Sequence, residues 1–172
     1  MENQANSKSV ILNYGLYTGI TSILIAVILY ALGKSAEPGI ALGIVSFVAP
    51  LVVLILGIKK FKSDNNGFMS WGQGVKIGVG VALVWGVLAL AFQLLLENVI
   101  APELVQQKLE VARTQMENFG MSEEIIEQQM EKAKNQNPLV ASSLALIFFI
   151  FIGFIVSAIA SAIMKKSEEE TY

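Results

Sequence analysis

The sequence predicts an all-α membrane protein, in which four transmembrane helices form a bundle and an extramembrane helical hairpin joins spans three and four. Of its 172 residues, 54% are hydrophobic and only 15% are charged, whereas a soluble domain typically carries about 25% charged residues. The apolar residues fall into four long blocks, and most of the charges lie between these blocks. Residues 1–172 are therefore expected to form a single integral membrane domain.

The first two apolar blocks cover residues 10–32 and 40–58, and neither contains a charged side chain. Because an α-helix rises about 1.5 Å per residue, a hydrocarbon core of about 30 Å needs roughly 20 apolar residues. Both blocks therefore predict transmembrane helices. A cleaved signal peptide ending near residues 31–33 is the alternative for the first block. It is disfavoured because the block exceeds the roughly 7–15 residues of a signal core, and Lys8 is the only basic residue before it.

The third and fourth blocks cover residues 77–96 and 139–164. Lys76 and Glu97 border the third block, and two lysines follow the fourth, so charges mark the ends of both spans. A helix satisfies its own backbone hydrogen bonds, which lipid cannot do. The alternative, four buried helices of a soluble core, needs a larger chain to cover them on every face.

Positive charges predict the orientation of the chain, because short loops rich in lysine and arginine stay in the cytoplasm. One side of the membrane carries seven lysines close to the spans. The other side carries Lys34 and four bases dispersed through a long acidic segment. Both termini are therefore expected to be cytoplasmic. The seven lysines are Lys8, Lys59, Lys60, Lys62, Lys76, Lys165 and Lys166.

Small residues spaced four apart predict faces on which membrane helices approach one another closely. Such spacing occurs in or beside all four spans, and packing within the four-helix bundle is the simplest interpretation. A homodimer through one of these faces is the alternative. The residues are Gly15, Gly19, Gly39, Gly43, Gly74, Gly78, Gly153, Ser157 and Ser161.

Two polar residues at the end of the third span form the candidate site. Gln93 and Glu97 lie four residues apart, so they share one helix face and are candidates for a polar vestibule on the outer side. Charges inside a span usually mark ion paths or proton relays, and none of the four blocks contains one. The alternative is that Lys76 and Glu97 simply extend toward water from the helix ends.

The connection between the second and third spans combines turn residues with aromatic residues. Asp64-Asn65-Asn66-Gly67 has the composition of a turn, and the rings of Phe68 and Trp71 suit the headgroup region of a membrane. We expect residues 67–76 to form a loop along the cytoplasmic surface before the third span begins.

The segment between the third and fourth spans, residues 97–138, carries eight glutamates against four basic residues. Two stretches have apolar residues at helical spacing, and Gly120 and Ser122 favour a helix stop and an N-cap between them. Residues 102–136 are therefore expected to form an acidic helical hairpin. Its apolar stripes most simply face each other; alternatively, they lie on the membrane surface or receive a partner helix. The stripe residues are Val105, Leu109, Ala112, Met116, Phe119, Ile125, Ile126, Met130 and Ala133.

The composition excludes several chemistries. The chain contains no cysteine and no histidine, which removes thiolate nucleophiles, thiol–metal sites and the usual general base. A net charge of −2 without a concentrated basic field gives no support to nucleic-acid binding. No nucleophile–base pair or metal constellation is found. We therefore expect no enzyme activity, no cofactor, and no catalytic or metal-binding residues.

Two motifs carry a family resemblance. They are Gly67-Phe68-Met69-Ser70-Trp71-Gly72-Gln73-Gly74-Val75-Lys76-Ile77-Gly78 and Tyr14-Gly15-Leu16-Tyr17-Thr18-Gly19. With the four spans, the basic second loop and the long acidic loop, the sequence resembles the domain of unknown function 4199 family over about residues 8–166. Members are small integral membrane proteins of Gram-negative bacteria. The resemblance implies a bacterial inner membrane, but it supplies neither an activity nor site residues.

The leading hypothesis is a non-catalytic interaction or assembly component of the bacterial envelope. Its spans would contact the lipid bilayer, and the acidic hairpin of residues 102–136 would contact another envelope protein. The alternative is a small homo-oligomeric channel or transporter that acts as a homodimer through the glycine faces.

Overall fold

The computed structural model describes residues 6–166, and within them four helices are long and apolar enough to cross a membrane. These helices are α1 (Ser7–Ala31), α2 (Gly39–Asp64), α3 (Trp71–Leu95) and α6 (Pro138–Met164). Helices α4 (Glu103–Asn118) and α5 (Glu123–Asn135) lie between α3 and α6 in the chain. The predicted fold class, four spans with a helical hairpin before the last, is therefore confirmed.

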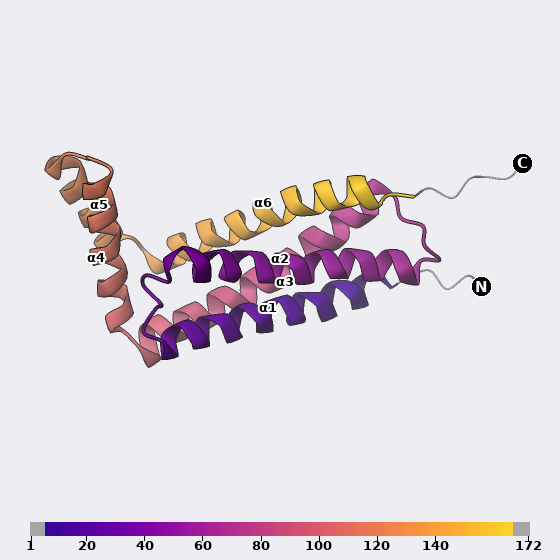
Figure 1. Cartoon of the computed structure of the whole chain (residues 1–172), viewed down its shortest axis with the longest axis horizontal. Helices are drawn as coiled ribbons and strands as arrows, with labels where there is room; N and C mark the ends of the chain where they lie inside the picture. Colours follow the sequence, from indigo (N-terminus) through magenta and orange to yellow (C-terminus); the bar gives the residue numbers. More distant parts are fainter. Residues whose placement is uncertain (1–5, 167–172) are drawn as a thin grey trace, which may run out of the picture.

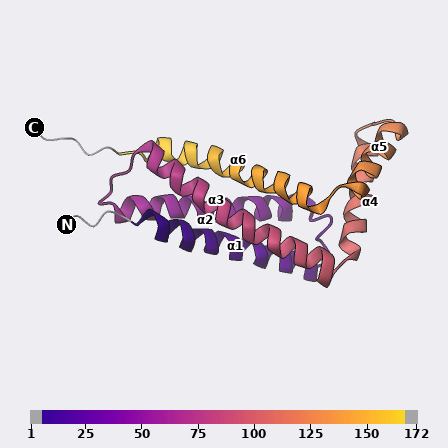
Figure 2. The same ribbon diagram turned by 180° about the vertical axis from the view of Figure 1, so that it is seen from behind.

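The spans form an elongated bundle with different structures at its two ends. The start of α1 and the end of α6 lie at one end, here called the termini end (Figure 1). Helices α4 and α5 lie at the opposite end, the hairpin end, and run across the bundle rather than along it. The view from behind shows the same arrangement (Figure 2). Helix α3 is central, since its contacts with α6 and α1 are the most extensive in the bundle and it also packs against α2.

Helices α2 and α3 are longer than their apolar blocks. Helix α2 continues past its block to Asp64, because lysine side chains near a helix end can reach water while their methylene stems stay in apolar surroundings. Helix α3 already begins at Trp71, so the expectation of a loop through residue 76 is wrong. The cause is a capping box: the Ser70 hydroxyl accepts a hydrogen bond from the Gln73 amide at 3.2 Å, and the Gln73 side chain accepts one from the Ser70 amide at 2.8 Å.

The termini end is closed by contacts between the α2–α3 connection and α6. Met69 and Lys166 exchange two backbone hydrogen bonds of 2.9 Å, and the Lys166 ammonium lies 5.2 Å from the centre of the Phe68 ring. The indole N–H of Trp71 donates to the carbonyl oxygen of Ala158 at 3.0 Å. These contacts fix the start of α3 against the end of α6.

Small residues allow α3 to approach its neighbours closely. A Cβ atom added at any of five glycines would overlap a residue of the facing helix, which is the close packing that membrane helices use in place of the hydrophobic effect. The overlaps join Gly15 to Val84, Gly19 to Leu88, Gly74 to Ser161, Gly78 to Ser157, and Gly153 to Ala82.

The pair Gly39 and Gly43 differs from the expectation. A Cβ atom at either position would meet nothing within 4 Å in the described part of the chain, so this pair makes no close packing within the bundle. Gly39 instead begins α2 with a φ of 71°, a backbone conformation that glycine adopts without steric cost. This face at the beginning of α2 is therefore not packed against another span.

Candidate functional site at the hairpin end

Packing density differs between the two halves of the bundle. Among the described residues, the buried positions of α2 begin only at Pro50, and those of α3 lie between Gly74 and Gly86. The main core cluster, including Leu54, Ile58 and Ile77, consequently lies in the half nearer the termini end. The half nearer the hairpin is more open, and it contains cavities.

The structure brings the two predicted vestibule residues together and adds a third. The Gln93 side-chain amide donates to a carboxylate oxygen of Glu97 at 3.2 Å, and the Lys108 ammonium donates to the same oxygen at 2.5 Å. The Glu97 side chain is 17% exposed and that of Lys108 is 40% exposed. Because the pair is only partly withdrawn from water, its contribution to stability is expected to be at most about 1 kcal/mol.

Glu97 is positioned by an irregular turn at the end of α3. Residues Leu96–Ile100 form a π-helical turn, η1, in which the Ala101 amide donates to the carbonyl of Leu96 at 2.7 Å. Leu96 and Ala101 are buried together with Leu104 at the base of α4. Single π-helical turns occur frequently at functional sites. The apolar cluster anchors α4 so that Lys108 reaches back to Glu97.

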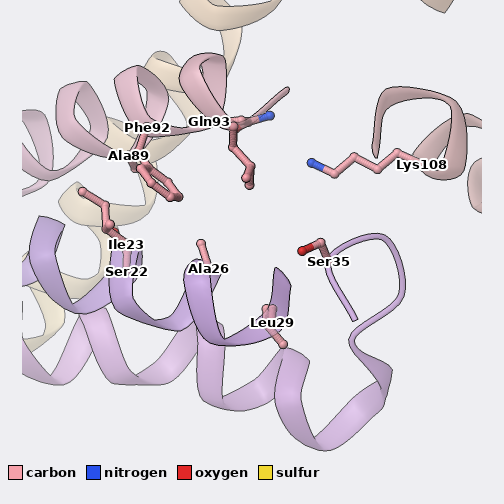
Figure 3. A pocket seen from close by; sticks show the side chains of 10 residues that line it. Ser22, Ile23, Ala26, Leu29, Ser35, Ala89, Phe92, Gln93 and Lys108 are labelled. Atoms are coloured by element: carbon pink, nitrogen blue, oxygen red, sulfur yellow. The ribbon is translucent and has the colours of Figure 1, made fainter. Parts of the chain in front are cut away.

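A cavity of about 200 Å³ lies between α1 and α3 beside this cluster. Gln93, Lys108 and Ser35 approach it from three different elements, while Ile23 and Phe92 line its apolar part (Figure 3). The Ser35 hydroxyl is buried and has no hydrogen-bond partner within residues 6–166. The cavity therefore combines polar groups with an apolar wall.

A larger cavity of about 610 Å³ lies between the end of the bundle and the hairpin. It shares Gln93 with the first cavity, and Glu97 also lines it. Ser142 of α6 and Lys134 of α5 contribute further polar side chains. Its size lies within the range of about 300–1,000 Å³ that is usual for ligand pockets.

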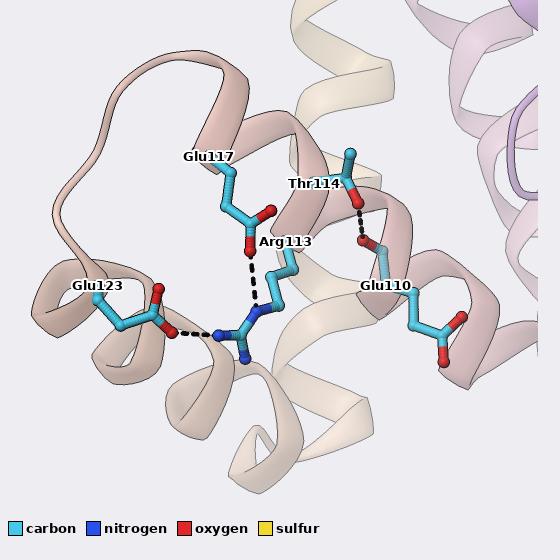
Figure 4. A network of polar contacts seen from close by, with 5 residues as sticks. All are labelled: Glu110, Arg113, Thr114, Glu117 and Glu123. Atoms are coloured by element: carbon cyan, nitrogen blue, oxygen red, sulfur yellow. Dashed lines mark hydrogen bonds and ion pairs between the residues drawn. The ribbon is translucent and has the colours of Figure 1, made fainter.

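The hairpin is held together by a guanidinium and by a small apolar contact. Arg113 on α4 donates from Nε to Glu117 at 3.1 Å and from its terminal nitrogen to Glu123 on α5 (Figure 4). The hydrogen bond that Arg113 donates to Glu117 and the negative charge of Glu123 raise the pKa of Arg113 above its ordinary value. On α5, Ile126 and Met130 are buried. The two predicted stripes therefore face each other over part of their length.

The tip of the hairpin remains apolar and exposed. Phe119 is 82% exposed, and Met121 and Ile125 are 45% and 47% exposed. Within the described residues, α5 contacts α4 and no other element. The predicted stripe residues Phe119 and Ile125 are therefore exposed and not buried between α4 and α5.

The sequence indicated some of these features and missed others. The four-residue spacing was sufficient to place Gln93 beside Glu97. Lys108 and Ser35 were missed because Lys108 lies on α4 and Ser35 lies in the connection between α1 and α2. No periodic pattern therefore connects them to Glu97. Within residues 6–166, no group of three or more histidine, cysteine or acidic side chains is arranged to hold a metal ion.

The fold and this arrangement define a four-span α-helical membrane protein with an extramembrane hairpin. The sequence profile of the family described as protein of unknown function (DUF4199) matches residues 13–166, and the chain belongs to this family. The family resemblance carried by the motifs at residues 67–78 and 14–19 is thus confirmed. No curated protein and no solved structure matches the chain.

Proposed function

We propose that this protein is a non-catalytic interaction or assembly component of the bacterial envelope, and that its α4–α5 hairpin binds another envelope protein. In this proposal the chain resides in the inner membrane, with both termini in the cytoplasm and the hairpin on the outer side. The distribution of lysines along the chain supports this orientation, because the lysine clusters adjoining the spans lie on the side of the termini.

The exposed apolar tip of the hairpin is the observation that carries the proposal. Exposed aromatic and methionine side chains are enriched at protein–protein interfaces, and Phe119 has the highest exposure of the three tip residues. Residues 97–138 carry eight glutamates against four basic residues, so this segment has a net negative charge. The expected partner therefore offers an apolar pocket for Phe119 with basic residues around its rim.

A photoreactive amino acid at position 119, introduced in cells, tests this proposal. A single defined protein should crosslink at position 119, and the same substitution at Val105, which is 40% exposed at the base of the hairpin, provides the control. The crosslinked protein should co-purify stoichiometrically with the full chain and be lost when residues 102–136 are deleted. Equal crosslinking from both positions, or an unchanged set of co-purifying proteins after the deletion, would contradict the proposal.

A second candidate function is a small homo-oligomeric channel or transporter. It is favoured by the two cavities that share Gln93 beside Glu97, since a partly buried carboxylate at a cavity wall is a common feature of ion pathways. Liposomes that contain the purified protein should then show a solute flux that falls in Gln93→Ala or Glu97→Ala. The absence of flux for ions and small metabolites would leave the interaction role as the better account.

A further inference from the structure

A third cavity extends the open half of the bundle toward the membrane. It has a volume of about 420 Å³ and lies between α2 and α6, with α1 and α3 also contributing to its wall. Four of its ten lining residues are aromatic, and these come from α2, α3 and α6: Phe47, Trp85, Phe148 and Phe149. Because these residues belong to membrane spans, the medium around this groove is lipid rather than water.

The groove adjoins the polar cluster at the hairpin end. Ser22 and Ala89 line both the groove and the cavity beside Lys108, and Gln93 lines both that cavity and the one under the hairpin. The three spaces are therefore neighbours, in the order of the cavity under the hairpin, the cavity beside Lys108 and the groove. A series that is polar at one end and apolar at the other matches an amphiphilic molecule, not a water-soluble one.

The polar end presents two opposite charges and unsatisfied hydrogen-bonding capacity. The Glu97 carboxylate and the Lys108 ammonium pair with each other, and the buried Ser35 hydroxyl has no partner in the described chain. Lys108 and Ser35 both face the cavity between α1 and α3 (Figure 3). A headgroup that carries a phosphate and an ammonium can replace the pair without leaving either protein charge unpaired, because the phosphate binds Lys108 and the ammonium binds Glu97.

We infer that this crevice is a binding site for one zwitterionic glycerophospholipid of the phosphatidylethanolamine type. The headgroup lies at Glu97, Lys108 and Ser35, and an acyl chain occupies the aromatic groove between α2 and α6. A purely anionic lipid is disfavoured, since it would bring its phosphate near Glu97 without an ammonium group to compensate. The inference concerns the bundle and does not depend on what the hairpin tip binds.

Gly43 offers a way to fill the groove without disturbing the fold. It lines the groove, and a Cβ atom at this position would meet nothing within 4 Å among the described residues. The variant Gly43→Leu therefore places its side chain where the acyl chain is expected. Gly72, at the termini end of α3, has equally open surroundings, so Gly72→Leu is a matched control.

Native mass spectrometry of the delipidated full chain in a non-ionic detergent tests the inference. Palmitoyl-oleoyl phosphatidylethanolamine should form a one-to-one complex that is at least about tenfold tighter than the complex with the corresponding phosphatidylglycerol. Gly43→Leu should weaken this complex by about tenfold or more, whereas Gly72→Leu and Phe119→Ala should retain it. Glu97→Gln should shift the preference toward phosphatidylglycerol, because the repulsion between the Glu97 carboxylate and the lipid phosphate is removed.

Two results would overturn the assignment: equal retention of phosphatidylethanolamine by Gly43→Leu and the parent chain, or a preference of the parent for phosphatidylglycerol. A second measurement does not need a groove variant to fold. In Trp71→Phe, Trp85 is the remaining tryptophan, and phosphatidylethanolamine with a brominated acyl chain should quench its fluorescence saturably at one lipid per protein. Quenching that is linear in lipid, as expected from bulk bilayer alone, would also overturn the assignment.

Discussion

The contact between α3 and α6 at Gly78 provides the most direct test of how the bundle is held together. A Cβ atom at Gly78 would overlap the Cβ of Ser157 and would approach the Ile58 side chain to 3.2 Å. The variant Gly78→Ala must therefore displace α6, and α2 limits the space on the other side. Forcing extra atoms into a packed interior costs typically 1–3 kcal/mol.

An opposing effect has to be subtracted from this cost. Alanine favours a helix over glycine by about 1 kcal/mol, so the net loss for Gly78→Ala is expected to be up to roughly 2 kcal/mol, or up to about a 30-fold change in the folding equilibrium. Gly43→Ala gains the same helix propensity without the overlap. This variant should be as stable as the parent, or more stable.

Reversible unfolding in mixed micelles with increasing sodium dodecyl sulfate measures this difference, with Trp85 fluorescence as the signal because Trp85 is 5% exposed in the folded chain. Gly78→Ala should unfold at a lower detergent fraction than Gly43→Ala. The double variant Gly78→Ala/Ser157→Gly should recover most of the loss, since it moves the small residue to the facing helix. Identical unfolding of the two single variants, or no recovery in the double variant, would refute the packing argument.

Three further predictions concern topology, the hairpin and the termini end. A cysteine at Ser63 should be shielded from an impermeant thiol reagent in intact cells, whereas one at Gln115 should react. Both side chains are exposed in the structure. The opposite labelling pattern would reverse the orientation. Arg113→Ala removes the guanidinium contact with Glu123, which joins α4 to α5, and the contact with Glu117 within α4. Because both pairs are exposed, overall stability should change little, and the loss should be seen as faster hydrogen exchange in α5; unchanged exchange would show that the apolar contact is sufficient. Trp71→Phe loses the hydrogen bond to the Ala158 carbonyl and should destabilise the bundle by about 0.5–1.5 kcal/mol, so an unfolding curve identical to that of the parent would contradict this role.

The apolar blocks could be located from sequence alone, but their ends could not. A hydropathy average ends the second span where the lysines of α2 begin, although the helix continues because its lysine side chains can reach water. It also cannot register the capping box at Ser70, whose two hydrogen bonds begin α3 six residues before the apolar block, at Trp71 rather than residue 77. Helix ends depend on such local hydrogen bonds, which average hydropathy does not contain.

The glycine pairs show a second limit. Gly39 and Gly43 have the same spacing as Gly74 and Gly78, yet α6 packs against the second pair, and nothing in the described chain packs against the first. The four-residue spacing of small residues indicates that a helix face permits another helix to approach closely. Whether another helix occupies that face depends on the positions of all four spans.

The sequence by itself determined that this chain crosses a membrane four times, that an acidic helical hairpin precedes the last span, and that Gln93 and Glu97 share a helix face. These properties follow from the hydrocarbon thickness and the helical repeat, which act over short stretches of chain. Only the tertiary structure decided that Lys108 reaches Glu97, that Phe119 remains exposed, and that the bundle is packed near its termini and open below its hairpin. Each of these depends on where residues distant in sequence meet, and that is governed by the packing of whole helices against one another.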